Sequence, residues 1–100
     1  MRPLPGDAVA RAALAALDQA PAVYRGTKLD GIRVTGAILA RLDDSGRGGY
    51  ARVKCGRRAE NRTVVANLEF PAMRPSASLS QGVVLVARFA AGYRVWAQLH

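Results

Sequence analysis

The hydrophobic positions near the start of the chain recur with the period of a helix. Asp7 follows Pro5 and Gly6 and belongs to the residue types that cap helix N-termini. The stretch 8–20 is rich in Ala and Leu, which are strong helix formers. We therefore predict an amphipathic helix over residues 7–20, ended by Pro21 and packed on the rest of the domain or on a partner chain. Its apolar face would contain Val9, Ala13, Ala16, Leu17 and Ala20, with Leu14 beside it.

From residue 31 the pattern changes to an alternation of apolar and polar residues, which is typical of half-buried strands. Gly36 interrupts the first such segment and indicates a bend or bulge. The segment 83–89 is apolar on both faces until Arg88 and is expected to be a central or doubly covered strand. Ala90-Ala91-Gly92 predicts a tight hairpin turn, with Gly92 free to take a positive φ. In all, we predict five strands, at 31–42, 50–55, 63–70, 83–89 and 93–99.

The alternation also assigns side chains to faces. In 31–42 the inner residues would be Ile32, Val34, Ile38, Ala40 and Leu42, and the outer ones Arg33, Thr35, Leu39 and Arg41. In 50–55 they would be Ala51, Val53 and Cys55 inside, and Tyr50, Arg52 and Lys54 outside. In 63–70 the inner residues would be Val64, Ala66, Leu68 and Phe70. In 93–99 they would be Tyr93, Val95, Ala97 and Leu99 inside, and Arg94, Trp96 and Gln98 outside.

These elements predict a single α+β, mainly β, domain over residues 1–100. A helix at 7–20 would precede a five-stranded antiparallel barrel or sheet over 28–100. Small sheets often avoid exposed edges by closing, and two small barrels fit the length: the oligonucleotide/oligosaccharide-binding (OB) type and the SH3-like type. The connection 71–82 lies where an OB barrel carries its helix. Pro71 and Pro75 depart from that pattern, and the helix is at the N-terminus instead.

Composition directs attention to acidic partners. The chain has 100 residues, half of them hydrophobic, and a formal net charge of +8. Such a charge attracts nucleic acid, acidic proteins or anionic membranes. Thirteen of the fifteen cations are Arg, which also occurs in proteins from GC-rich genomes, so the charge has both a functional and an incidental explanation.

Residues suited to catalysis or metal binding are scarce. The single His is the terminal His100, where it is poorly held for acid–base work. The single Cys excludes an intramolecular disulfide and a zinc site of several Cys, and Cys55 is expected to be a buried small hydrophobe. Asp43 and Asp44 lie in a glycine-rich loop, read as a solvated turn. We predict no enzyme activity, no metal and no cofactor.

The segment 46–49 is also glycine-rich, but it lacks the pattern of a phosphate-binding loop and is expected to be a flexible hairpin loop. Neither a signal peptide nor an apolar run of membrane-spanning length is recognisable, so we expect no membrane partner. The default expectation is a cytoplasmic protein of bacterial or phage type.

A basic cluster is the strongest positive signal. Residues 47–62 hold six cations against Glu60 and therefore carry +5 of the net +8. Arg and Lys neutralise phosphates, while an aromatic ring stacks on bases. This mixture predicts binding of single-stranded DNA or RNA on a basic β face, to which Arg33 and Arg41 would add outward charge. The candidate site residues are Arg47, Arg52, Lys54, Arg57, Arg58, Arg62, Arg94 and Trp96.

Other functions fit the same residues. Outward Arg side chains also serve as ordinary solubilising surface. Trp96 is either exposed or buried under the N-terminal helix. The second hypothesis is a small interaction or inhibitor protein of phage or plasmid type that binds an acidic surface of a larger, nucleic-acid-handling complex. A third is a subunit of an assembled particle. The Ala-rich helix face would permit a homodimer.

Overall fold

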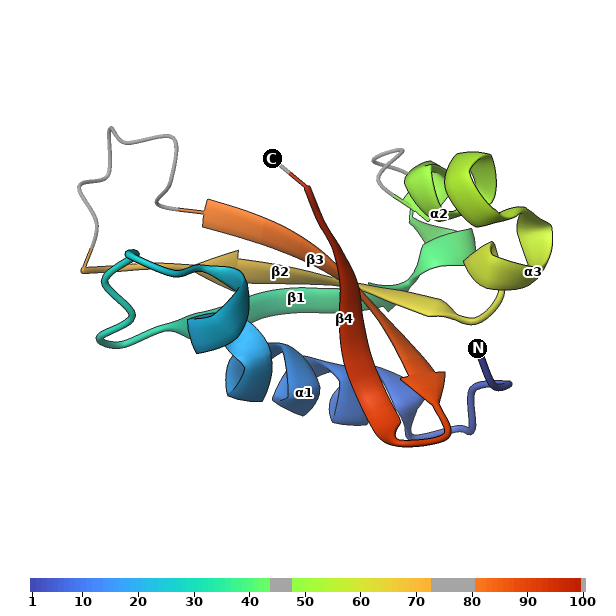
Figure 1. The fold of residues 1–100 in the computed structure, drawn as a ribbon, viewed down its shortest axis with the longest axis horizontal. Helices are drawn as coiled ribbons and strands as arrows, with labels where there is room; N and C mark the ends of the chain where they lie inside the picture. Colours follow the sequence, from blue (N-terminus) through green and yellow to red (C-terminus); the bar gives the residue numbers. More distant parts are fainter. Residues whose placement is uncertain (44–47, 73–80, 100) are drawn as a thin grey trace.

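A computed structural model of the chain describes residues 1–43, 48–72 and 81–99 (Figure 1). A helix precedes a run of strands that is interrupted by three short helical segments. In chain order the elements are α1 (Ala8–Val23), β1 (Arg33–Leu39), the 3-10 helix η1 (Ala40–Leu42), α2 (Gly48–Cys55), α3 (Arg57–Glu60), β2 (Thr63–Glu69), β3 (Gln81–Phe89) and β4 (Gly92–Leu99).

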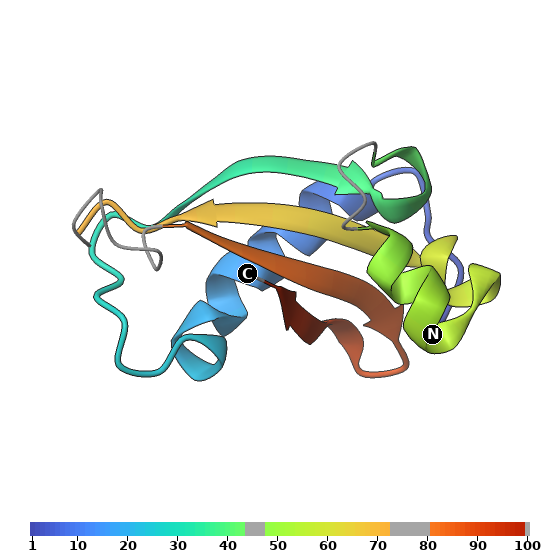
Figure 2. The ribbon, with the colours of Figure 1, turned by 90° about the horizontal axis from the view of Figure 1, so that it is seen from above.

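The strands form an open antiparallel sheet in the order β1-β2-β3-β4. Helix α1 lies across one face of the sheet, and α2 and α3 lie at one end (Figures 1 and 2). The α+β class with an N-terminal helix is confirmed. The five-stranded barrel, of either type, is wrong for the described residues: the segment expected to be the second strand is helical, and β1 and β4 remain as edges.

The error lies at residues 50–55, which belong to α2. Ala51 is fully buried whereas Val53 is 84% exposed, so two residues that a strand would place on one side have opposite environments. Cys55 is exposed as well, so its expected burial is wrong. An alternation over six residues is too short to separate the two periods, and Ala, Arg and Lys are all good helix formers.

Helix α1 begins close to the predicted position but continues through Pro21 to Val23. A proline in the last turn removes one backbone donor, and the next bonds still form, since the Tyr24 amide donates to the Ala20 carbonyl at 2.8 Å. Asp7 does not cap the helix with its side chain. It pairs with Arg11 instead, and this hydrogen bond lowers the pKa of the Asp7 carboxyl.

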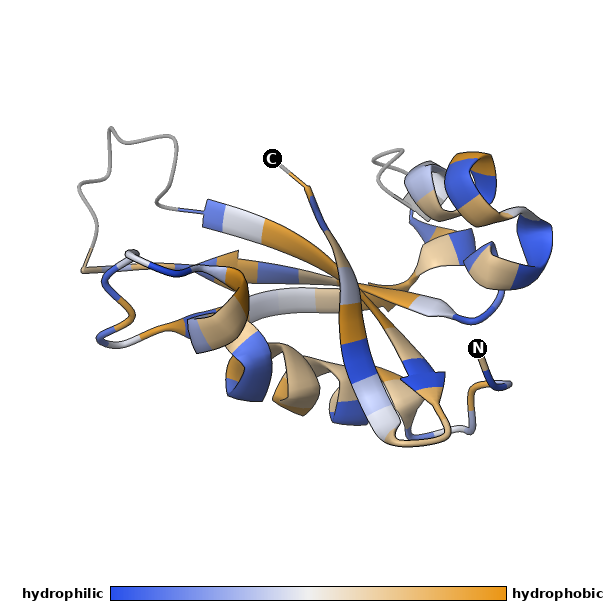
Figure 3. Ribbon diagram, viewed as in Figure 1, coloured by the Kyte–Doolittle hydropathy of each residue, from blue (hydrophilic) through white to orange (hydrophobic). Residues whose placement is uncertain are grey.

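The buried stripe of α1 consists of small residues spaced by four, whereas Val9 and Leu17 lie at its borders and Leu14 is 68% exposed. Figure 3 shows most of this helix as hydrophobic. Small side chains let the helix approach the sheet closely. The stripe is covered within the chain. Its members are Ala8, Ala12, Ala16 and Ala20.

The two central strands, β2 and β3, are buried on both faces. On the α1 side lie the inner residues predicted from the alternation of β2 and the residue that follows it: Val64, Ala66, Leu68 and Phe70. On the other side, Val65, Val83 and Leu85 pack with Ala51 of α2. Strand β3 is buried from Gly82 to Ala87, which confirms its prediction as a doubly covered strand. The tight turn after it is also confirmed, with Gly92 at a φ of 117°.

Two bulges change which face the edge strands present. The register of β1 shifts between Val34 and Gly36, so the predicted bulge is confirmed, but beyond it Leu39 packs on the core and Ile38 is 37% exposed. Their expected sides were therefore wrong. In β4, Val95 pairs with Val86 and faces α1, while Ala97 pairs with Leu85 and faces the opposite side. An extra residue in a bulge breaks the alternation on which the predictions rested.

Two other predicted connections are only partly described. Of the loop 43–49, residues 44–47 lie outside the described residues, and Gly48 and Gly49 begin α2. Of the connection 71–82, residues 73–80 lie outside the described residues, and Gln81 and Gly82 begin β3. The terminal His100 is not described either.

Candidate functional site

Helices α2 and α3 form a small unit, here called the helical lobe (residues 48–62), at one end of the sheet (Figure 1). Ala51 and Ala59 are its buried anchors. Thr63, fully buried at the start of β2, donates its hydroxyl to the Ala59 carbonyl at 2.8 Å. Gly56 joins the two helices at a φ of 86°, a conformation that favours glycine. The lobe is therefore held in place by packing and backbone geometry, and its charged residues are free to face outward.

The lobe carries five of the eight candidate residues. Four of them are exposed and Arg62 is half-buried; the five are Arg52, Lys54, Arg57, Arg58 and Arg62. Glu60 is the only acidic residue in 48–62. The two ion pairs between described residues, Asp7–Arg11 and Arg33–Glu69, both lie outside the lobe. Among the described residues, no ion pair therefore engages any of these five cations.

Aromatic rings connect the lobe to β4. The ammonium of Lys54 lies 5.8 Å from the centroid of the Tyr50 ring. The Tyr50 ring in turn lies 6.2 Å from that of Trp96, at an angle of 32°. Trp96 is half-buried on the sheet face opposite α1, so it lies neither under the N-terminal helix nor fully in the open. Burial of its indole Nε1 and contact with Tyr50 limit the ring area left for stacking.

Arg94 stands on the same face of the sheet as the lobe. It pairs in register with Ala87, which pairs with Thr63, and side chains directly opposite each other in antiparallel strands share a face. Thr63 and Val65 are two residues apart on β2, and Val65 packs with Ala51 of the lobe. The fold thus turns Arg94 toward the side of the lobe. Arg47 lies outside the described residues.

Sequence reasoning missed two contributors. Tyr50 was expected to point outward, but it was not placed in the site that it connects. Met1 was not considered, because nothing in the chain order suggests that the N-terminus reaches the lobe. The signal for Tyr50 was its position beside a run of cations. No sequence signal indicated Met1, since its position depends on tertiary contacts.

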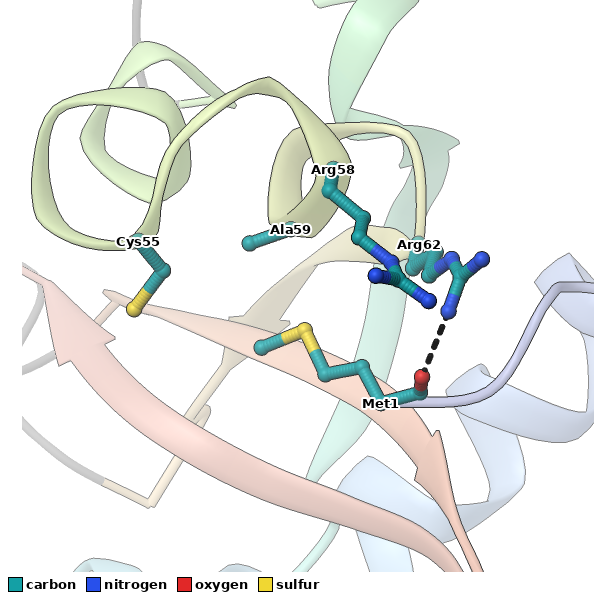
Figure 4. Close-up of a pocket in the computed structure, with 5 residues that line it drawn as sticks. All are labelled: Met1, Cys55, Arg58, Ala59 and Arg62. Atoms are coloured by element: carbon teal, nitrogen blue, oxygen red, sulfur yellow. Dashed lines mark hydrogen bonds between the residues drawn. The ribbon is translucent and has the colours of Figure 1, made fainter.

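Those contacts create a cavity of about 380 Å³ between α3 and the N-terminal segment (Figure 4). The side chains of Arg58 and Arg62 line it together with Met1, Cys55 and Ala59. Arg62 donates from Nη1 to the Met1 carbonyl at 2.8 Å. Two of the lobe's cations therefore share one concave site.

Two further observations describe the chemistry of the molecule. Within residues 1–43, 48–72 and 81–99, His, Cys, Asp and Glu nowhere gather in threes as a metal site requires. None of the helices in those ranges has the length and apolar character to cross a bilayer.

Comparison with protein-family models, with curated proteins and with solved structures gave no match to this chain. The class defined by the fold is a small α+β domain, with a helix on one face of a four-stranded antiparallel sheet and a basic helical lobe at its end.

Proposed function

We propose that the protein is a non-catalytic nucleic-acid-binding module and that the helical lobe is its binding surface. The observation that carries the proposal is the uncompensated charge of the lobe: five cations lie on one compact, anchored unit, and the described residues supply no ion pair to any of them. Clustered cations release counterions from a phosphate backbone, which supplies most of the sequence-independent affinity.

The geometry favours phosphate contacts over base stacking. Lys54 lies over the Tyr50 ring, and Trp96 is half-buried, so neither ring offers a free face of full size. Arg52 and Lys54 are two residues apart on α2 and point to different sides of a helix that is only eight residues long. A flexible single strand can follow such a surface more easily than a stiff duplex can. Single-stranded DNA or RNA is therefore the proposed ligand.

The salt dependence of binding tests the proposal. Each phosphate contact with a single strand contributes about −0.7 to the slope of log K against log salt. We expect Arg52→Gln with Arg57→Gln to make that slope shallower by about 1.4 and to weaken binding about 10-fold at low salt. Fluorescence anisotropy with a short labelled oligonucleotide, single-stranded and then duplex, measures both quantities.

A matched control removes the same charge elsewhere. Arg25 and Lys28 are exposed in the segment after α1, at the end of the sheet away from the lobe (Figure 1). The variant Arg25→Gln with Lys28→Gln is expected to keep most of the affinity and the slope. Equal losses in the two double variants would mean that net charge, not the lobe, drives binding. Absence of binding to any oligonucleotide at low salt would overturn the proposal.

A protein partner is the second candidate, and exposed apolar side chains favour it. Val53 is 84% exposed between Arg52 and Lys54, and Leu42 is 51% exposed on η1, which packs against α2. These two apolar side chains would not contribute to phosphate binding. Apolar residues surrounded by cations are instead complementary to an acidic protein surface.

We expect Val53→Ser with Leu42→Ser to leave oligonucleotide binding within about 2-fold, because no charge is removed. If the partner is an acidic protein, the same variant should lose a partner that the wild-type chain captures after nuclease treatment. Quantitative pull-down followed by titration of the purified partner measures this. Equal capture by the variant and the wild type would contradict the protein-binding candidate.

A further inference from the structure

We propose that the cavity between α3 and the N-terminal segment binds a phosphate monoester, namely the terminal phosphate of a nucleic-acid strand. The inference deepens the proposed function and rests on it, because the cavity belongs to the helical lobe. It assigns different roles to two neighbouring arginines: Arg58 would hold the strand end, and Arg57 would contact the backbone outside.

The first argument is the convergence of two guanidinium groups. Figure 4 shows Arg58 and Arg62 reaching into the same space from α3 and the turn that follows it. None of the side chains that line the cavity is a carboxylate, and the hydrogen bond from Arg62 goes to a neutral carbonyl. A guanidinium has five N–H donors, so most of the donors of this pair are available to a ligand. An anion between them would relieve the repulsion of two like charges.

The second argument is the fit of phosphate to arginine. A planar guanidinium presents two parallel N–H groups that match two phosphate oxygens, and two arginines can share the three free oxygens of a monoester. A monoester carries nearly two negative charges near neutral pH and ends a chain. It therefore offers three free oxygens to the two arginines, whereas an internal diester offers only two.

The third argument is that hydrogen bonds hold the N-terminal segment, which forms one side of the cavity, in place. The Arg2 amide donates to the Arg88 carbonyl at 2.6 Å, and Arg88 donates from Nη1 to the Pro3 carbonyl at 3.3 Å. Together with the bond from Arg62 to Met1, these contacts fix the N-terminal segment beside α3. A site that is formed before binding loses less entropy when the ligand enters.

The side of the cavity opposite the two arginines is apolar. The side chains of Met1 and Ala59 and the thiol of Cys55 line it (Figure 4). The volume of about 380 Å³ lies within the range of about 300–1,000 Å³ for small-molecule sites. This volume is larger than that of a phosphate group. It leaves room for the sugar or base of the first nucleotide against the apolar side.

The decisive measurement compares one oligonucleotide with a 5′-phosphate and with a 5′-hydroxyl, both labelled at the 3′ end, by anisotropy with the full chain. We expect the phosphorylated strand to bind about 10-fold tighter, the size of a good charge-assisted pair. Arg58→Gln should bring the ratio close to one, while Arg57→Gln, the same change on the same helix, should keep it. A ratio of one in the wild type, or equal loss of the ratio in both variants, would overturn the site.

A second readout places the ligand in the cavity and separates the two proposals. Cys55 is the only cysteine in the chain and lines the cavity, so its alkylation by iodoacetamide reports on a single thiol at this site. Adenosine 5′-monophosphate should slow the reaction several-fold in the wild type and in Arg57→Gln, but not in Arg58→Gln; adenosine should have no effect. If no oligonucleotide binds but adenosine 5′-monophosphate still protects Cys55, the nucleic-acid proposal fails. The phosphate-monoester site is then retained, with a free nucleotide as its ligand. If oligonucleotides bind without a 5′-phosphate preference or protection, only the site fails.

Discussion

Replacing Gly82 by Ala is expected to lower the free energy of unfolding by about 3 kcal/mol, the upper part of the range for forcing extra volume into a packed core. A Cβ at this position would collide with the hydroxyl of Tyr24 and lie 2.8 Å from its ring Cζ and 3.1 Å from Phe70 Cε2. Tyr24 and Phe70 are buried and pack edge to face at 4.8 Å between ring centroids. Neither ring can move without disturbing the core under α1.

The companion variant Tyr24→Phe shows whether the collision is the cause. The Tyr24 hydroxyl is buried, with no hydrogen-bond partner among the described residues, so its removal alone is expected to change stability by less than about 1 kcal/mol. In the Gly82→Ala background the same change should recover at least half of the loss. Urea unfolding of the four proteins in the cycle measures the coupling. Simple additivity of the two single changes would contradict the proposed contact.

The ionisation of Tyr24 also makes the stability of these variants depend on pH. Burial raises the pKa of Tyr24 above its ordinary value of 10.0. Above that pH the unfolded chain loses the proton before the folded chain does, so the stability that is present below pH 10 decreases as the pH rises. Tyr24→Phe should therefore have a shallower alkaline loss of stability than the wild type.

Gln19→Glu is expected to lower the free energy of unfolding by about 2 kcal/mol, because it breaks a hydrogen-bond pair that covers an edge of the sheet. The amide of Gln19 donates to the Tyr93 carbonyl and accepts from the Val95 amide, each at 2.8 Å. One side chain thus satisfies two backbone groups on the open side of β4, as a neighbouring strand would. An ionised carboxylate cannot donate and would face the Tyr93 carbonyl.

The control for this change is Gln98→Glu, the same substitution at an exposed position of β4 itself, which should cost less than about 0.5 kcal/mol. Gln19→Ala should in addition leave part of the β4 edge unpaired. We expect light scattering to show a larger, concentration-dependent mass for Gln19→Ala than for the wild type. Equal stability of the two Gln→Glu variants would show that Gln19 does not support the edge.

The contrast between residues 63–70 and 50–55 shows where sequence patterns succeed. Val64 to Phe70 alternate over a full strand, and both faces of the neighbouring β3 are apolar, so any helical arrangement would leave part of these surfaces in water. The segment from Tyr50 to Cys55 alternates equally well over six residues, but of Ala51, Val53 and Cys55 the fold buries only Ala51. Packing of Ala51 against Val65 and Leu85 of the sheet buries that residue in a helix.

The candidate site was predictable as a set of residues and not as a surface. The run of cations at 52–62 follows from chain order, so its members lie close together in either a strand or a helix. The role of Trp96 was not predictable, because a bulge in β4 and the position of α2 decide how much of its ring is covered. The cavity was invisible in the sequence, since Met1 and Arg62 meet only through the folded N-terminal segment.

The sequence by itself determined the positive charge of this protein and its concentration in residues 47–62. It also determined the N-terminal helix and the doubly buried strand β3. These features depend on residue type and on periods sustained over many residues. Only the tertiary structure decided that the sheet stays open with four strands, that the basic segment is a helical lobe, and that Arg58 and Arg62 share a cavity. These features depend on contacts between distant segments, which a local period does not encode.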